Sequence, residues 1–237
     1  MAPPPSAPRR PHVGTLREKP LHASLKQWCA GEGDLFEEPV DGFVIDVVSG
    51  DHLIEVQTSG FSSMKRKLPA LLDLGHRVRV VHPIAATKWI VKVDQEGSEI
   101  SRRRSPKHGD VTDVFAELVS IPDLVGNPNL EVLVVMTAED EVRRHDPARA
   151  WRRKGWVIEE RRLVEIIDTL LLSGPADLAG LLPPDLPVEW TTADLASRLD
   201  RPRRIAQQMA YCLRECGAAV AVGKQGNAVV YRTVDQP

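Results

Sequence analysis

The sequence predicts an α/β fold: a mixed β-sheet with flanking helices, followed by a smaller C-terminal domain. Two apolar strand segments lie on either side of a tight turn at Ser49-Gly50-Asp51, as in a β-hairpin. Strand-like and helix-like segments then alternate as far as residue 136, which favours an α/β domain over a helical bundle or a β-sandwich. From about residue 159 the pattern changes to helices and short turns that end in a second hairpin.

Composition limits the class of protein. The chain has 237 residues, 42% of them apolar, which suits one large domain or two smaller ones. No segment resembles a membrane span or a signal peptide, so we expect a cytoplasmic protein with no membrane partner. The three cysteines and the histidines, His22 among them, lack metal-ligand spacing and are assigned no role. Because the net charge is −2, any surface that attracts nucleic acid must be local.

Two helices are expected in the first 75 residues. Residues 16–30 have the apolar spacing of a helix, and Pro20 is tolerated there if it lies in the first turn. Residues 61–74 have the spacing of a second helix, which Pro69 kinks or splits and Gly75 ends.

The rest of the sheet is expected from three further apolar segments. Residues 77–83 and 88–93 read as two strands, and residues 130–136 as another buried strand. Between them lie a basic loop at residues 101–110 and an amphipathic helix at residues 111–119.

The C-terminal part reads as helical. Residues 160–172 have the pattern of an amphipathic helix, and a linker-like boundary is expected within residues 155–190. Thr191 is an N-cap for a helix to Leu199, and Pro202 begins a helix to about Cys216. A hairpin then closes the chain. The predicted domains are a disordered proline-rich tail at residues 1–13, an α/β domain at residues 14–158, and a C-terminal domain at residues 159–237.

The first hairpin carries the candidate site. If Gly50 and Asp51 are the loop residues, position i pairs with 101 − i, and Asp46 lies opposite Glu55. Because side chains alternate along a strand, Asp46, Glu55 and Gln57 share one face. The other face is then wholly apolar, formed by Phe43, Ile45, Val47, Ile54 and Val56.

Two carboxylates opposite each other lie about 5 Å apart at Cβ and repel unless a cation or a proton lies between them. A divalent metal site at Asp46 and Glu55 is therefore the functional interpretation. The alternative is a solvated strand face at the edge of the sheet.

This hairpin, preceded by a helix bearing Glu18, resembles the PD-(D/E)XK nuclease superfamily, the restriction endonuclease-like fold, over about residues 14 to 140. The resemblance implies that Asp46 and Glu55 hold one or two Mg²⁺ or Mn²⁺ ions, with Glu18 as an accessory ligand. It also implies a catalytic role for Gln57, which stands where the family has a lysine that helps to place the attacking water.

The match departs from the family pattern at Gln57, because glutamine orients water but brings no positive charge. Lys65 or Lys67, on the following helix, could supply that charge in space. Asp41 is the rival strand aspartate if a bulge shifts the register.

The C-terminal order of helix, tight connection, helix and hairpin resembles a winged helix-turn-helix domain. The resemblance implies that Arg201, Arg203 and Arg204 begin a helix that enters the DNA major groove, with Lys224 at the tip of the wing. Residues 191–232 contain seven basic and three acidic groups, which favours DNA contact. The alternative is a winged helix used for protein dimerisation.

A second basic cluster lies at residues 143–162, with eight basic against three acidic residues. Arg152, Arg153 and Lys154 lie between Trp151 and Trp156, a composition that suits a phosphate-backbone groove with stacking bases. The alternative is that both tryptophans anchor a loop while the arginines stay solvated. Arg102 to Arg104 are expected in a solvated loop.

These patterns predict a metal-dependent DNA endonuclease or resolvase-like protein of repair or defence, with DNA as partner. Two alternatives stay open: a non-catalytic DNA-binding regulatory protein on a nuclease-like scaffold, and a module that binds a protein partner or forms a homodimer. The blocks LREKPLHASLKQW and MAYCLRECGA resemble a family of uncharacterised bacterial proteins, which implies no activity.

Overall fold

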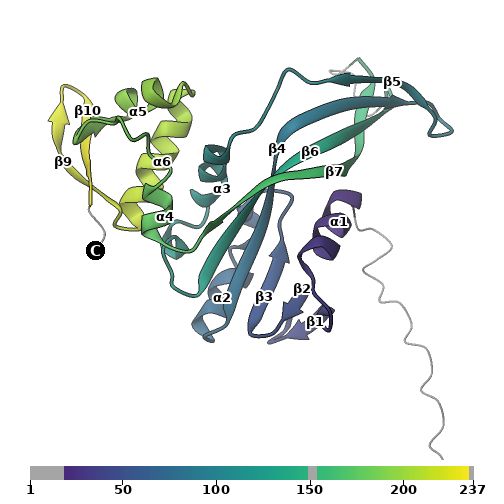
Figure 1. The fold of residues 1–237 in the computed structure, drawn as a ribbon, viewed down its shortest axis with the longest axis horizontal. Coiled ribbons are helices and arrows are strands. Elements are labelled where there is room, and N and C mark those ends of the chain that lie inside the picture. Colours follow the sequence, from purple (N-terminus) through teal and green to yellow (C-terminus); the bar gives the residue numbers. More distant parts are fainter. Residues whose placement is uncertain (1–18, 149–153, 235–237) are drawn as a thin grey trace, which may run out of the picture.

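The computed structural model describes residues 19–148 and 154–234, which form an α/β structure around one large mixed sheet (Figure 1). The sheet has seven strands in the order β1-β2-β3-β4-β6-β7, with β5 pairing only with β4. Its strands are β1 (Leu35–Val40), β2 (Phe43–Ser49), β3 (His52–Val56), β4 (Arg77–Val93), β5 (Glu99–Arg104), β6 (Leu130–His145) and β7 (Trp156–Leu172). The expected α/β class with flanking helices is thereby confirmed.

The sheet is mixed because of how its strands are connected. Strands β1, β2 and β3 form an antiparallel meander. The helical connection after β3 then returns the chain so that β4 runs parallel to β3. Strand β6 is parallel to β4 and β7 antiparallel to β6.

Helices cover the two faces of this sheet. On one face, α1 (Pro20–Cys29) buries Leu21 and Leu25 against Val47, Val81 and Val135. On the other face lie α2 (Lys67–Asp73) and α3 (Phe115–Leu118), with the short helices η2 (Phe61–Met64), η3 (Val111–Val114) and η4 (Pro122–Leu124). No helix in the described part of the chain is long and apolar enough to cross a membrane.

The helices expected at residues 16–30, 61–74 and 111–119 are present in shorter form. The second is split into η2 and α2, and Pro69 lies in the first turn of α2, where a missing N–H costs no hydrogen bond. Gly75 ends α2 with φ 85° and donates its N–H to the carbonyl of Leu72.

The expected strand lengths are wrong, because β4, β6 and β7 continue beyond the body of the sheet as a long arm (Figure 1). The strands expected at residues 77–83 and 88–93 are one strand, since β4 pairs with β6 across the intervening residues with a register shift between Ala85 and Thr87. The expected basic loop begins instead as β5, which pairs with the outer part of β4 and carries Arg102 to Arg104.

The largest correction concerns residues 160–172, which are part of β7 and not a helix. Strand β7 pairs with β6 from Trp156 to Leu172. The hydrogen bonds of a full-length ladder outweigh the weak local preference that suggested a helix. The main sheet therefore extends to residue 172, and the expected domain boundary after residue 158 is too early.

The C-terminal unit contains α4 (Pro175–Ala179), β8 (Glu189–Thr191), α5 (Thr192–Leu199), α6 (Arg203–Glu215), β9 (Ala219–Gln225) and β10 (Ala228–Thr233). Its three strands form a separate sheet in the order β8-β10-β9. Thr191 caps α5 as expected, accepting from the N–H groups of Ala193 and Asp194. Buried residues of α6 share one apolar cluster with Phe115 of α3, so the unit packs directly against the main sheet's helices.

Candidate functional site at the open end of the first hairpin

The expected register of the first hairpin is confirmed. Val47 pairs with Ile54 and Ser49 with His52, so the partner of position i is 101 − i and the loop is Gly50-Asp51. At the next position of the hairpin, beyond the Val47–Ile54 pair, side-chain carboxylates accept hydrogen bonds from backbone N–H groups. The N–H of Asp46 lies 3.4 Å from Oε1 of Glu55, and the N–H of Val56 donates to Oδ2 of Asp46 at 2.9 Å.

The side chains of β2 stop alternating regularly between the two faces of the sheet at Asp46, because Ile45 and Val47 pack on opposite faces. On the β1 side, Phe36 pairs with Val47 and Glu38 with Ile45. Between them Glu37 adopts φ 53°, a left-handed conformation that is uncommon for glutamate. Asp46, opposite Glu37, therefore lies at an irregularity between two regular stretches of the ladder.

The expected apolar face is broken at this point. Val47 and Ile54 pack with α1, as one face requires, but Ile45 packs in the cluster that contains α2. The prediction that Asp46 shares a face with Glu55 is also wrong in consequence, because Asp46 is contacted from α1 and Glu55 from α2.

Asp46 is held by His22. The Nε2 atom of His22, on α1, lies 3.2 Å from Oδ2 of Asp46. Burial raises the pKa of Asp46, but the hydrogen bonds from His22 and from the N–H of Val56 outweigh it, and the pKa lies below its ordinary value. Asp46 is therefore held as a carboxylate.

Glu55 is held by Lys67. Its side chain accepts from Nζ of Lys67, which also donates to the carbonyl of Val44 at 2.5 Å. Glu55 is only 8% exposed. Burial raises the pKa of Glu55, Lys67 lowers it, and nearby Asp46 raises it again, so that the net pKa lies above its ordinary value. Of the two candidate lysines, the contact is made by Lys67, whereas Lys65 is exposed.

Gln57 does not point at the two carboxylates. Its Nε2 donates to Oγ of Ser59 at 2.9 Å, to the carbonyl of Gly60 at 2.9 Å and to Oγ of Ser63 at 2.7 Å. The side-chain amide thus stabilises the turn that leads from β3 into η2. The side chain that contacts Glu55 is Lys67 and not Gln57.

The other expected carboxylates are not brought to this site. Asp41 lies in the turn between β1 and β2, at φ 48°, and pairs with Nε2 of His76 at 2.6 Å. The irregularity at Asp46 does not shift Asp41 into its place. Glu18 lies outside the described residues, as do Arg152 and Arg153.

Two residues that the sequence did not single out belong to the site. His22 and Lys26 are four residues apart on α1 and so lie on one face of the helix. Lys26 donates to Oε1 of Glu37 at 2.8 Å, beside the contact from His22 to Asp46. This i, i+4 pair of basic groups on an amphipathic helix was the available signal.

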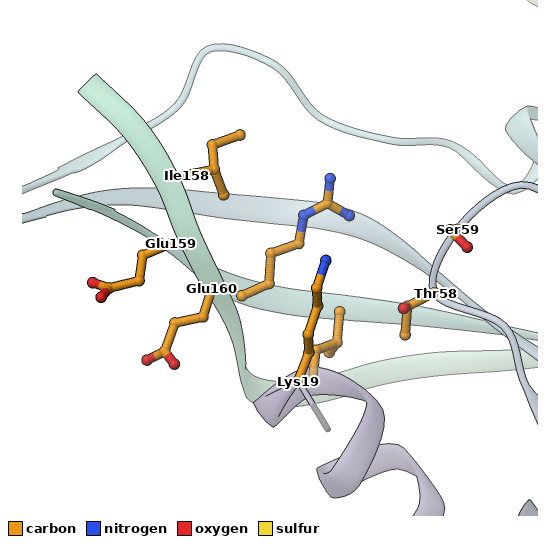
Figure 2. Close-up of a pocket in the computed structure, with 8 residues that line it drawn as sticks. Lys19, Thr58, Ser59, Ile158, Glu159 and Glu160 are labelled. Atoms are coloured by element: carbon orange, nitrogen blue, oxygen red, sulfur yellow. The ribbon is translucent and has the colours of Figure 1, made fainter. Parts of the chain in front are cut away.

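A cleft of about 330 Å³ opens at the start of α1 (Figure 2). It is lined by Lys19 and Leu21 at the start of α1, by Thr58 and Ser59 after β3, and by Ile158 to Arg161 of β7. Figure 2 shows Lys19 rising from α1 between Glu160 and Thr58. Leu21 precedes His22 in α1 and Thr58 follows Gln57 after β3, but neither Asp46 nor Glu55 lines the cleft.

The basic segment at residues 143–162 is largely neutralised where it is described. The guanidinium groups of Arg143, Arg144 and Arg162 pair with Glu141, Glu159 and Glu160 at 2.5, 3.0 and 2.5 Å. Trp156 is covered on one side, because Nζ of Lys92 lies 4.1 Å from its ring centroid. Trp151 lies outside the described residues, whereas Lys154 is exposed.

The C-terminal basic residues divide into two groups. Arg201 pairs with Asp113 of η3, so its charge is used inside the protein, contrary to expectation. Arg203 and Arg204 are exposed at the start of α6. Lys224 is exposed on β9, one residue pair before the turn at Gly226-Asn227.

The comparisons with known proteins identify the family but no activity. A family model described as a domain of unknown function, DUF8091, matches residues 19–173, a range that ends where β7 ends. An uncharacterised protein of Treponema pallidum (strain Nichols) is 31% identical over 222 residues, covering 93% of this chain and 87% of that protein. No solved structure matches significantly. The chain therefore belongs to the DUF8091 domain family.

Proposed function

We propose that the protein is a metal-dependent DNA endonuclease, resolvase-like in its action on phosphodiesters. The observation that carries the proposal is the closeness of two carboxylate residues where the β2–β3 ladder ends. The backbone N–H of Asp46 lies 3.4 Å from Oε1 of Glu55, Lys67 donates to the same oxygen, and the charge of Asp46 is near enough to raise the pKa of Glu55. Two carboxylates and an ammonium group are the donor set that phosphodiester hydrolysis needs, because negative charge must be neutralised on the phosphoryl group.

The order of elements supports the same proposal. Helix α1, the antiparallel meander of β1 to β3, helix α2 and a strand β4 parallel to β3 follow one another in the chain. This is the element order that suggested a PD-(D/E)XK core. The candidate carboxylates lie on the two strands of the hairpin, as that resemblance implies.

The donor set fits one mode of magnesium binding. In the described part of the chain, no group of three or more His, Cys, Asp or Glu side chains could hold a metal ion. Mg²⁺ or Mn²⁺ is commonly held by one or two carboxylates together with substrate phosphates and water, and Asp46 and Glu55 suit that arrangement. When bound, the metal polarises the phosphoryl group and lowers the pKa of water.

The residues of the chain have separable roles in this proposal. Lys67 supplies the positive charge that Gln57 cannot bring, and it moves from Glu55 toward the phosphate as substrate enters. His22 positions Asp46 through the contact to Oδ2. Gln57 shapes the turn at Ser59 and Gly60, which borders the cleft.

We further propose that the C-terminal unit is a winged helix that holds DNA. Its order of β8, α5, α6 and a β9–β10 hairpin supports this interpretation. Arg203 and Arg204 on α6 and Lys224 on β9 are exposed and can reach phosphates. Lys154 is exposed beside Arg152 and Arg153 and would add contacts from the arm.

Supercoiled plasmid incubated with the full-length protein and Mn²⁺ tests the proposal. We expect nicking by the wild type, and its loss in Asp46→Asn, Glu55→Gln and Glu55→Ala. Glu99→Gln, which changes an exposed glutamate at the start of β5, is the matched control and should retain nicking. Nicking that survives in the Asp46 and Glu55 variants, or none by the wild type with any DNA structure, contradicts the proposal.

One observation favours a non-catalytic DNA-binding protein instead. Asp46 and Glu55 already have side-chain partners within the protein, His22 from one face and Lys67 from the other. If these contacts persist with DNA bound, the cluster is structural and the winged helix alone provides the function. Gel shifts with Mn²⁺ that show DNA binding but no cleavage would select this alternative, whereas no DNA affinity at low salt would favour a protein partner.

A further inference from the structure

The loop after β5 is hydrogen-bonded to β4 on both sides of the register shift between Ala85 and Thr87. The N–H of Ser105 donates to the carbonyl of Lys88 at 2.7 Å, and the N–H of Gly109 donates to the carbonyl of Ala85 at 2.8 Å. A Cβ at Gly109 would lie 2.5 Å from Cγ2 of Ile84 and 3.0 Å from the carbonyl oxygen of Ala85. Only glycine allows this close approach, so residues 105–109 have a defined position on the strand.

A cleft of about 450 Å³ lies between this loop and β4. Its lining contains Ala86 and Pro106 but is mainly polar and basic. The polar and basic lining residues are Thr87, Arg104, Ser105, Lys107 and His108. No carboxylate lines the cleft, although the chain as a whole has more acidic than basic residues.

The positive charge of this cleft is not neutralised. Within residues 19–148 and 154–234, no carboxylate forms an ion pair with Arg104, Lys107 or His108. The guanidinium group of Arg104 lies 3.4 Å from Oγ1 of Thr87, a neutral partner. By contrast, Arg102 on the same strand is paired with Asp140 at 2.9 Å and stacked 4.4 Å from the ring centroid of Trp89. Burying an anion in the cleft would therefore displace no internal carboxylate.

The donors in the cleft suit a phosphate group. A guanidinium group matches two phosphate oxygens at once, an ammonium group adds a point charge, and the hydroxyls of Thr87 and Ser105 add neutral donors. We propose that this cleft binds a phosphodiester group of a nucleic-acid strand, outside the Asp46–Glu55 site. This inference rests on the nucleic-acid substrate proposed above and assigns a contact on the arm.

The segment after the loop favours a polymeric ligand over a single ion. Residues 110–113 lead from the cleft into η3, where Asp113 pairs with Arg201 just before α6. Residues 110–113 and the Asp113–Arg201 ion pair thus connect the cleft to the segment that carries the exposed Arg203 and Arg204. A strand with regularly spaced phosphates can contact both places, whereas a free phosphate ion can occupy only one.

Fluorescence anisotropy with the full-length protein tests the inference. A labelled single strand and a labelled duplex are titrated in EDTA, which prevents cleavage, between about 50 and 200 mM salt. We expect Arg104→Ala and Lys107→Ala each to weaken binding about three- to tenfold. We also expect each to reduce the salt slope for duplex DNA by about 0.9, the value for one lost phosphate contact.

Arg77→Ala is the matched control, because it also removes one exposed positive charge. Arg77 is the first residue of β4 and lies at the end of that strand away from the arm. Binding in this control should equal that of the wild type. Arg104 and Lys107 variants that behave like Arg77→Ala would overturn the inference, as would a wild type that binds neither probe. Arg104→Lys should retain most of the affinity if charge is the property that matters.

A second experiment distinguishes binding of a nucleic-acid strand from binding of a free phosphate ion. Inorganic phosphate alone is added while the melting temperature is followed. A phosphate-dependent shift that disappears in Arg104→Ala, with strand affinity unchanged, would identify a site for free phosphate and overturn the inference. Because these assays need no catalysis, Glu55-dependent nicking together with unaffected binding by the Arg104 variant would reject this site and leave the proposed function standing.

Discussion

Lys67 on α2 contacts Glu55 on β3, and so a helix on one face of the sheet places a positive charge beside a carboxyl group whose pKa burial raises. Nζ of Lys67 also binds the carbonyl of Val44 on β2. One ammonium group therefore joins both strands of the hairpin to α2. This contact brings a lysine to the candidate site even though position 57 is a glutamine.

Lys67→Met should lower the free energy of unfolding by about 3 kcal/mol, because it leaves a buried carboxylate without its partner. Urea denaturation at neutral pH measures this loss. The variant's folded state should hold the Glu55 proton more tightly, with a pKa raised further above the ordinary value of 4.5. Both folded proteins hold the Glu55 proton more tightly than the unfolded chain, so the deficit relative to the wild type should grow as pH rises through the wild-type folded pKa and level off above the higher folded pKa of the variant.

The double variant Glu55→Gln/Lys67→Met is the control for this prediction. It removes both charges, so most of the stability lost in Lys67→Met should return. Equal stability of the wild type and Lys67→Met would mean that the contact contributes nothing to the fold.

Asp46→Asn should change how stability depends on pH. Burial raises the pKa of Asp46, but the hydrogen bonds from His22 and the N–H of Val56 hold it below 3.8. The carboxylate should therefore contribute about 2 kcal/mol at neutral pH, the order expected for hydrogen bonds to a charged group. This contribution is present above pH 3.8 and is lost as pH falls through the depressed folded pKa.

Urea denaturation of the wild type and Asp46→Asn across the acid range measures the difference. The two proteins should differ most at neutral pH and converge below pH 3.8. A constant difference would show that the effect of the substitution does not come from the charge. His22→Gln should reproduce part of the loss, because it removes the stronger of the two hydrogen-bond effects on Asp46.

The local features of the fold were predictable where short-range chemistry decides them. The turn at Gly50-Asp51 fixed the hairpin register, and with it the opposition of Asp46 and Glu55. The cap at Thr191 likewise fixed the start of α5. The facing of Asp46 was not predictable, because it depends on Glu37 adopting a left-handed conformation that glutamate does not favour.

Strand β7 was missed for a different physical reason. Three register shifts interrupt its pairing with β6, so that its apolar residues do not alternate strictly. Leu163, Ile166, Ile167 and Leu170 then fall at the three- and four-residue spacing of a helix. Only the ladder with the preceding strand β6, a contact that the local sequence pattern does not show, decides the structure of this region.

Arg201 and its neighbours Arg203 and Arg204 should respond differently to substitution. Arg201 pairs with Oδ1 of Asp113, whose Oδ2 accepts from the N–H of Asp110 at 2.9 Å. Arg201→Ala breaks this link between the C-terminal unit and η3, and should lower the free energy of unfolding by about 1–2 kcal/mol. Urea denaturation measures this loss, and DNA affinity at low temperature should change little.

Arg203→Ala and Arg204→Ala are the matched controls, since each removes the same side chain from the same segment. Both residues are exposed, so stability should change by less than about 0.5 kcal/mol. If α6 contacts DNA, each substitution should weaken duplex binding and reduce the salt slope by about 0.9. The opposite pattern, with Arg201→Ala weakening DNA binding while stability is unchanged, would mean that the Asp113 contact opens when DNA binds and that all three arginines face the duplex.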